Sequence, residues 1–216
     1  MGRGTSKIGK SAGGGGGNGQ PNDATEYYVS GEGMWINQYL RGKGDFGELS
    51  SEEKEFLNDL DTATNGKITD DTLYRSVDAS AVFGNISDVD YTNLSTALNY
   101  GGDTFGKGAY ADGVRDKVNK IISNTDGKSI TERGFMSTTT SASVAEEWGD
   151  FTGSEKPIVM KIKPSKNTKG VNLSTYDKNV SKEEAQHERL LARNQSYKVK
   201  KIYAKNGLIY VDAFMD

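Results

Sequence analysis

The stretch "EEAQHERLLARNQSYKV", residues 183–199, passes from acidic and polar side chains into an apolar run. This pattern predicts a strand that begins at Gln186. Because side chains alternate along a strand, Gln186 and Glu188 would share one face and His187 would point the other way. An amide would then lie beside a carboxylate. Taken alone, the Gln-x-Glu pair fits a solvated strand end equally well, and we expect His187 to be structural or exposed.

The chain after residue 130 is rich in β-branched and aromatic residues, which is typical of strands. Asn206-Gly207 separates the last two predicted strands and is a hairpin signal. A short helix is expected over 141–148. The predicted strands cover 134–140, 156–164, 170–174, 186–192, 197–204 and 208–214.

The chain before residue 125 has a mostly helical pattern. Ser50 and Glu53 have the spacing of a capping box at the start of a helix over 50–60. A helix over 34–42 ends on glycine and carries Asn37 and Arg41 four residues apart, on one face. Further helices are predicted over 89–101 and 112–122, and a short strand over 72–77. The sequence therefore predicts an α+β fold, with a helical N-terminal portion followed by a β-rich half.

The first 24 residues differ in composition from the rest. They are rich in Gly, Ser and Asn and include five consecutive glycines at 13–17. This composition predicts a flexible tail or linker over 1–24. We expect one folded domain over 25–216.

The composition excludes several kinds of site. The 216 residues include no cysteine and one histidine, which rules out thiolate sites and argues against a metal centre built on several histidines. The net charge of −3 gives no support for nucleic acid as a partner. No apolar run approaches the roughly 20 residues that span a bilayer, and the N-terminus does not resemble a secretory signal. We expect a protein that is cytoplasmic, or delivered by a non-classical route, with no membrane partner.

Three further motifs carry polar side chains that could do chemistry: the Asn37 and Arg41 pair already described, and two in predicted strands. Arg75 lies in the middle of a short predicted strand, where a charge needs an anionic partner. Ser137, Thr138 and Thr139 follow an aromatic residue in another strand. Each motif alone has an ordinary explanation, such as a surface ion pair for the arginine or the β-propensity of threonine. Their order along the chain is more informative than any one of them.

That order resembles the mono-ADP-ribosyltransferases of the R-S-E class, and most closely the clostridial Rho-inactivating exoenzymes. "YYVSGEGMWINQYLRG" at 27–42 is similar to the first NAD-contacting helix of that family, and "LYRS" at 73–76 to its first-strand arginine motif. "GFMSTT" at 134–139 resembles its Ser-Thr-Ser strand, and residues 186–199 resemble its Gln-x-Glu strand. The resemblance implies two packed, mainly antiparallel β-sheets that form an NAD cleft.

The resemblance also implies roles for single residues. Arg75 and Arg41 would bind the phosphates of NAD⁺, because a guanidinium fork pairs with phosphate oxygens, and Asn37 would assist them. Ser137 would position Glu188, and Thr138 would line the site and support the strand. Glu188 would bind the ribose 2′-hydroxyl and stabilise the positive charge that develops as the nicotinamide bond breaks. No metal is required.

Gln186 would contact the acceptor. In the family, glutamine at this position accompanies asparagine or another acceptor that is not arginine. The predicted activity is therefore transfer of ADP-ribose from NAD⁺ to a protein side chain, more readily asparagine than arginine. The target could be a small GTPase or another host protein, and the enzyme would act as a monomeric toxin or effector, or as a phage-encoded host modifier.

Two alternatives stay open at this point. The same residues would serve an NAD⁺ glycohydrolase that uses water as acceptor, or an inactive module that keeps the fold. The sequence also departs from the Rho-modifying relatives, since Glu183 occupies a position where they carry an aromatic residue. An acidic loop there favours a basic patch on the target.

Overall fold

The computed structural model describes residues 19–216 except for 44, 102–107, 152–153 and 180–184. The α+β class predicted from the sequence is confirmed. The described helices are α1 (Asp23–Val29), η1 (Glu32–Met34), α2 (Trp35–Leu40), α3 (Ser51–Ala63), α4 (Ser80–Phe83), α5 (Asp88–Tyr100), α6 (Ala109–Thr125), α7 (Ala142–Phe151) and η3 (Ser174–Asn179).

The described strands form one continuous sheet in the order β1-β6-β7-β4-β2-β5-β9-β8-β3. The pairing is antiparallel except between β5 and β9. The two halves of this sheet meet at β2 and β4, which share the single pair Tyr74↔Thr139. The strands are β1 (Gly66–Lys67), β2 (Leu73–Asp78), β3 (Ser129–Glu132), β4 (Met136–Thr139), β5 (Pro157–Lys163), β6 (Lys169–Asn172), β7 (Glu188–Leu191), β8 (Gln195–Lys205) and β9 (Leu208–Met215).

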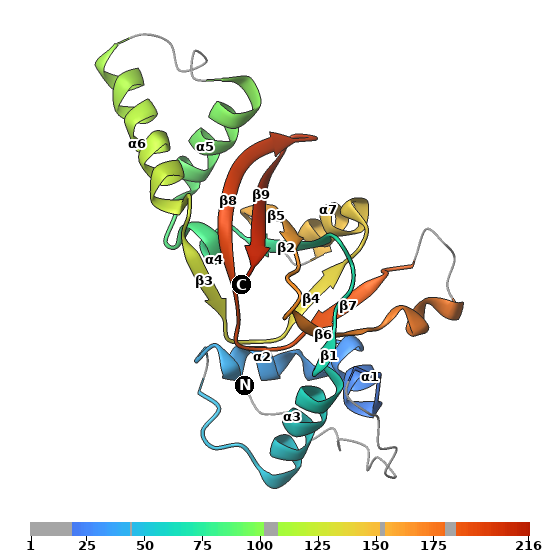
Figure 1. Cartoon of the computed structure of the whole chain (residues 1–216). Helices are drawn as coiled ribbons and strands as arrows, with labels where there is room; N and C mark the ends of the chain where they lie inside the picture. The colour runs from blue at the N-terminus through green and yellow to red at the C-terminus, as the bar shows by residue number, and fades with distance from the viewer. Residues whose placement is uncertain (1–18, 44, 102–107, 152–153, 180–184) are drawn as a thin grey trace.

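Helices pack against different parts of this sheet (Figure 1). α1, α2 and α3 lie beside the half that contains β1, β6, β7 and β4, and they share a core with Phe135 and Leu190. α5 and α6 pack on the other half, where Leu94 and Val118 join the larger core. α7 covers part of the opposite face of that half, with Ala145 against the sheet. The chain therefore holds β4 and β7 between two separate cores.

Local sequence signals account for several element boundaries. Ser50 and Glu53 form the predicted capping box at the start of α3. Asn206 and Gly207 both have positive φ in the turn between β8 and β9, as the hairpin signal requires. Among the described residues, no helix is long and apolar enough to cross a bilayer.

The folded part begins earlier than predicted. Asn22 caps α1 in a capping box with Thr25, and the N–H of Gly19 donates to the carbonyl of Ala63. Residues 19–24 therefore pack against the domain instead of belonging to a flexible tail. The sequence pattern did not predict a helix start at Asn22, because glycine-rich sequence precedes it. Residues 1–18, and with them the polyglycine run, lie outside the described residues, as do Glu183 and Glu184.

Candidate active site

Glu188 begins β7 and lies directly opposite Thr139 of β4. The Ser137 hydroxyl, two residues along the same face of β4, hydrogen-bonds to the Glu188 carboxyl. Burial raises the pKa of the Glu188 carboxyl to about 6, although the Ser137 hydrogen bond opposes the rise and the charge of Asp177 adds to it. The structure thus brings two predicted site residues together and gives the carboxyl an environment typical of functional sites.

A chain of polar groups continues from Ser137 into α1 and α2. The Tyr28 hydroxyl also hydrogen-bonds to Ser137, and it accepts a bond of 2.6 Å from Asn37 Nδ2. Tyr28 is buried, and Arg75, Glu188 and Arg41 all act electrostatically on its hydroxyl. Tyr28 therefore marks the point where the predicted catalytic carboxylate and the predicted phosphate-binding arginines meet.

Asn37 has partners other than those expected from the resemblance. Its Nδ2 donates to Tyr28 and, at 3.1 Å, to the carbonyl of Phe135, while its Oδ1 accepts from the N–H of Phe135 at 2.8 Å. Both amide hydrogens are therefore used within the protein. Gly134 permits this approach, because a Cβ there would lie 2.5 Å from Asn37 Oδ1. In this structure Asn37 joins α2 to the segment before β4 and has no donor left for NAD⁺.

Arg41 and Arg75 converge on a carboxylate that the sequence did not point to. Glu132, the last residue of β3, accepts from Arg41 Nε at 2.9 Å and lies 3.6 Å from Arg75 Nη1. The N–H of Gly134 also donates to this carboxylate. Burial alone would raise the pKa of Glu132, but the Arg41 hydrogen bond and the charge of Arg75 bring it below its ordinary value.

Two arginines facing one glutamate leave positive charge and donors in excess. Arg41 Nη2 is buried and has no hydrogen-bond partner. Burial lowers the pKa of Arg75, with the charge of Glu132 opposing that effect. A buried guanidinium donor without a partner is costly unless an anion satisfies it. The cluster is therefore suited to an anionic ligand such as a phosphate.

The strand predicted from Gln186 begins two residues later, at Glu188. His187 has a φ of 49°, in the left-handed region, so the backbone bends there and simple alternation does not apply. Gln186 is exposed on this bend. The sequence missed the bend because glycine and asparagine usually occupy such positions, and histidine gives little signal.

Side chains from two neighbouring segments hold the bend. The carboxylate of Asp177, in η3, accepts the N–H of Gln186 at 3.1 Å and the N–H of His187 at 2.9 Å. Thr139 Oγ1 donates to the Gln186 carbonyl at 2.6 Å. Two successive N–H groups on one carboxylate form an anion-binding turn. Asp177 thus determines where Gln186 lies relative to Glu188.

Thr138 supports the pairing of β4 with β7. It is fully buried, and its hydroxyl donates to the carbonyl of Arg189 across β4 and β7 at 2.7 Å. This observation agrees with the strand-supporting role expected for Thr138 and leaves its hydroxyl occupied. That hydroxyl proton is therefore used within the protein, and a contact of Thr138 with NAD⁺ stays a prediction.

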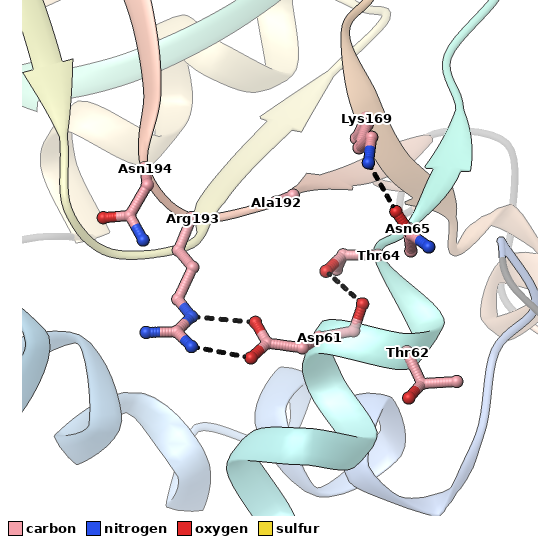
Figure 2. Close-up of a pocket in the computed structure, with 8 residues that line it drawn as sticks. All are labelled: Asp61, Thr62, Thr64, Asn65, Lys169, Ala192, Arg193 and Asn194. Carbon is pink, nitrogen blue, oxygen red and sulfur yellow. Dashed lines mark hydrogen bonds and ion pairs between the residues drawn. The ribbon is translucent and has the colours of Figure 1, made fainter.

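A polar pocket of about 480 Å³ lies apart from these residues (Figure 2). It lies between the end of α3 and the turn after β7, and none of the predicted site residues lines it. Arg193 pairs with both carboxylate oxygens of Asp61, and Lys169 donates to Asn65. These contacts of Arg193 and Lys169 join the end of α3 to the sheet. Among the described residues, no group of three or more His, Cys, Asp or Glu side chains is placed to hold a metal ion.

The model of one protein family, described as ADP-ribosyltransferase exoenzyme, matches residues 19–213. The chain belongs to the ADP-ribosyltransferase exoenzyme family. The enzyme class predicted from the sequence, an NAD⁺-protein ADP-ribosyltransferase, is thereby confirmed, and so is NAD⁺ as co-substrate. Curated proteins give no match.

Solved structures of other ADP-ribosyltransferases share the fold of this exoenzyme. A Staphylococcus aureus protein of the C3 type, solved with NAD, has a TM-score of 0.60 and 19% identity over 89% of this chain and 84% of the other. An ADP-ribosyltransferase from Clostridium botulinum has a TM-score of 0.57 and 23% identity over the same shares, 89% and 84%. The C3 exoenzyme of Clostridium limosum has a TM-score of 0.56 and 21% identity over 90% and 83%.

Three residues of the candidate site were not predicted from the sequence. Tyr28 lay within the helix motif that carried the resemblance, and a tyrosine nine residues before Asn37 was a weak signal. Glu132 and Asp177 gave no signal at all, because their partners are distant in sequence or lie on an irregular bend. These residues became visible only once the fold had placed them.

Proposed function

We propose that this exoenzyme cleaves the nicotinamide–ribose bond of NAD⁺ at Glu188 and transfers ADP-ribose to a protein side chain other than arginine, with asparagine favoured. The supporting observation is that the Tyr28 hydroxyl interacts with Ser137 and is within electrostatic reach of Glu188 and of the Arg41–Arg75 pair. One substrate that carries both a pyrophosphate and a reacting ribose can reach both groups. A protein target with a basic surface patch, such as a small GTPase, fits the acidic residues before Gln186.

The chemistry follows from the surroundings of the carboxylate. When the glycosidic bond breaks, positive charge builds at C1′ of the ribose, and a carboxylate held nearby stabilises that charge. Ser137 keeps Glu188 oriented from the Tyr28 side. Arg41 and Arg75 supply donors for the pyrophosphate and hold it while nicotinamide leaves.

The exposed amide of Gln186 would contact the acceptor side chain. An amide both donates and accepts, so it pairs with an acceptor amide, whereas arginine would favour a carboxylate. Asp177 holds the backbone of Gln186 next to Glu188, which keeps the acceptor close to the reacting carbon.

The first test replaces Glu188 with Gln, which keeps the shape and removes the charge. We expect release of nicotinamide from NAD⁺ to fall by about 100- to 1,000-fold, with NAD⁺ affinity changed by less than about threefold. Nicotinamide release and calorimetric NAD⁺ binding measure the two effects. Retention of most of the release rate would remove Glu188 from the reaction.

The second test separates transfer from hydrolysis. Lysate and a purified small GTPase are each incubated with the enzyme and labelled NAD⁺, and mass spectrometry locates ADP-ribose on every residue type. Gln186→Ala should lose protein labelling and retain release of free ADP-ribose. Gln186→Glu is the matched variant that restores a polar side chain with a different acceptor preference. If wild-type enzyme releases only free ADP-ribose, the glycohydrolase alternative holds.

A further inference from the structure

A group of lysines surrounds strand β9 on the side of the sheet turned away from α5 and α6. On β9, Asp212 and Phe214 point to this side, while Val211, Ala213 and Met215 enter the core. The flanking strands contribute lysines next to them. We call this surface the lysine face; its members are Lys161, Lys163, Lys198, Lys200, Lys201, Asp212 and Phe214.

The register gives the lysine face a regular pattern. Phe214 has Lys163 beside it on β5 and Lys198 beside it on β8. Asp212 likewise has Lys161 on one side and Lys201 on the other. The ladder is irregular between Val199 and Lys201, which places Lys200 at the bulge. Each outward-facing position of β9 in this region is thus flanked by lysines on both sides.

Phe214 is exposed at the centre of the lysine face. Its side chain is 41% accessible, and it is one of few large apolar side chains so exposed among the described residues. The ammonium groups of Lys163 and Lys200 lie 5.9 and 5.8 Å from its ring centre. These cation–π contacts orient the two lysines around the ring. An aromatic ring within a charged rim resembles the central residue of a protein interface.

The local charge is opposite to that of the whole chain. The net charge of the protein is −3, yet five lysines gather here against the carboxylates of Asp71 and Asp212. Among the described residues, no carboxylate forms an ion pair with any of the five. Lysine is also poorly suited to strands. On β5, which is paired with β2 on one side and β9 on the other, protection of an exposed edge does not explain the lysines.

A hollow beside Phe214 adds shape to this surface. It has a volume of about 290 Å³ and is lined by Asp71, Thr72, Lys161, Lys163, Asp212, Ala213 and Phe214. Its two carboxylates can accept the backbone N–H groups of a polypeptide, whereas the phosphate groups of a nucleic acid or a lipid offer no such donors. A single exposed apolar side chain also buries too little apolar area to bind a bilayer.

We propose that the lysine face is a docking surface for an acidic polypeptide segment of a partner protein, with an aromatic side chain of that segment packed against Phe214. The lysines would attract the acidic residues, and the hollow would receive the side chain. The surface needs no NAD⁺, so this inference does not depend on the assignment of Glu188 or Gln186.

The test uses two synthetic polypeptides: poly-L-glutamate and a random copolymer of glutamate and tyrosine. We expect the wild-type enzyme to bind both, and the copolymer more tightly by at least about threefold, because tyrosine adds an aromatic contact. Phe214→Ser, which keeps the charge, should remove that preference. The double variant Lys163→Glu/Lys200→Glu should lose at least about tenfold in affinity for both probes at low salt.

The matched control is Lys54→Glu/Lys120→Glu, which makes the same charge change at exposed positions on α3 and α6. This control should bind both polypeptides with an affinity within about twofold of the wild type, because salt screens the effect of its changed net charge. NAD⁺ cleavage and thermal unfolding, measured on every variant, should match wild type. An equal loss in the control would overturn the proposal, and so would an absence of the copolymer preference. Tighter lysine-dependent binding to a single-stranded oligonucleotide or to phosphatidylserine vesicles would replace the polypeptide with that partner.

Discussion

Glu132 is the residue that most changes the picture of the site. It places one negative charge between Arg41 and Arg75, the two groups expected to meet the pyrophosphate. The Glu132 carboxylate offsets the repulsion between the two guanidinium groups. It pairs with only some of their N–H donors. The remaining donors, including the unpartnered Nη2 of Arg41, stay available to a second anion.

Replacing Glu132 with Gln tests this view of the arginine pair. Without the carboxylate, the two guanidinium groups repel each other, and the free energy of unfolding should fall by about 1–3 kcal/mol. NAD⁺ should then stabilise the variant more than it stabilises the wild type, because its phosphates restore the missing negative charge. Thermal unfolding with and without NAD⁺ gives both quantities. The exposed Glu55→Gln on α3 is the control, and an unchanged stability for Glu132→Gln would contradict the argument.

Among the elements, α2 is joined to β4 through one amide. Asn37 exchanges two hydrogen bonds with the backbone of Phe135, as a neighbouring strand would. The helix thereby holds the start of β4, on which Ser137 lies.

Asn37→Leu should therefore act on stability before it acts on NAD⁺. The substitution leaves a buried N–H and a buried carbonyl of Phe135 without partners, which should lower the free energy of unfolding by about 2–4 kcal/mol. Urea unfolding measures it, with the exposed Asn119→Leu on α6 as control. If Asn37→Leu weakened NAD⁺ binding and left stability unchanged, the contact expected from the resemblance would be the better description.

The bend between η3 and β7 couples the position of Gln186 to the acidity of Glu188. Asp177 binds the backbone of the bend, and its charge adds to the raised pKa of Glu188. Asp177→Asn should lower the pKa of Glu188, so the acidic limb of NAD⁺ cleavage should move to lower pH. The pH profile of nicotinamide release measures this shift. Asp59→Asn on α3 should leave the limb in place, and a limb equally unmoved in Asp177→Asn would refute the coupling.

The elements that the sequence predicted well are those with local signals. The capping box at Ser50, the Asn206-Gly207 turn and the helical pattern over 112–122 depend on neighbouring residues, so pattern alone locates them. The bend at His187 and the partners of Glu132 depend on contacts across the fold. Arg41 lies 91 residues from Glu132, and no periodicity in the sequence reports such a pair.

At the scale of the whole molecule, the order of the strands in the sheet could likewise not be predicted from the sequence pattern. The family resemblance implied two packed sheets, and the described strands form two halves that are continuous through the single pair Tyr74↔Thr139. The order of the motifs predicted which residues form the candidate site more reliably than it predicted the contacts between them. It named Arg75, Ser137 and Glu188, which the fold brings close to Tyr28, but it did not reveal that the amide of Asn37 is occupied.

Ionisation of Glu188, the proposed catalytic carboxylate, should lower the free energy of unfolding of the whole molecule. The pKa of Glu188 is about 6 in the folded state, raised from an ordinary value of 4.5. Between these values the folded state binds more protons than the unfolded state, so stability falls as pH rises through about 6. Below pH 4.5 both states are protonated, and the full stability is present.

Glu188→Gln should therefore stabilise the fold only at neutral pH. The gain in the free energy of unfolding should be near zero at about pH 4 and reach about 1–2 kcal/mol at about pH 7.5, as expected for a carboxyl that is buried for function. Urea unfolding of the variant and the wild type across this range measures the difference. Glu55→Gln should show no such trend. A gain that is constant with pH would mean that better packing, and not removal of a buried charge, stabilises the variant.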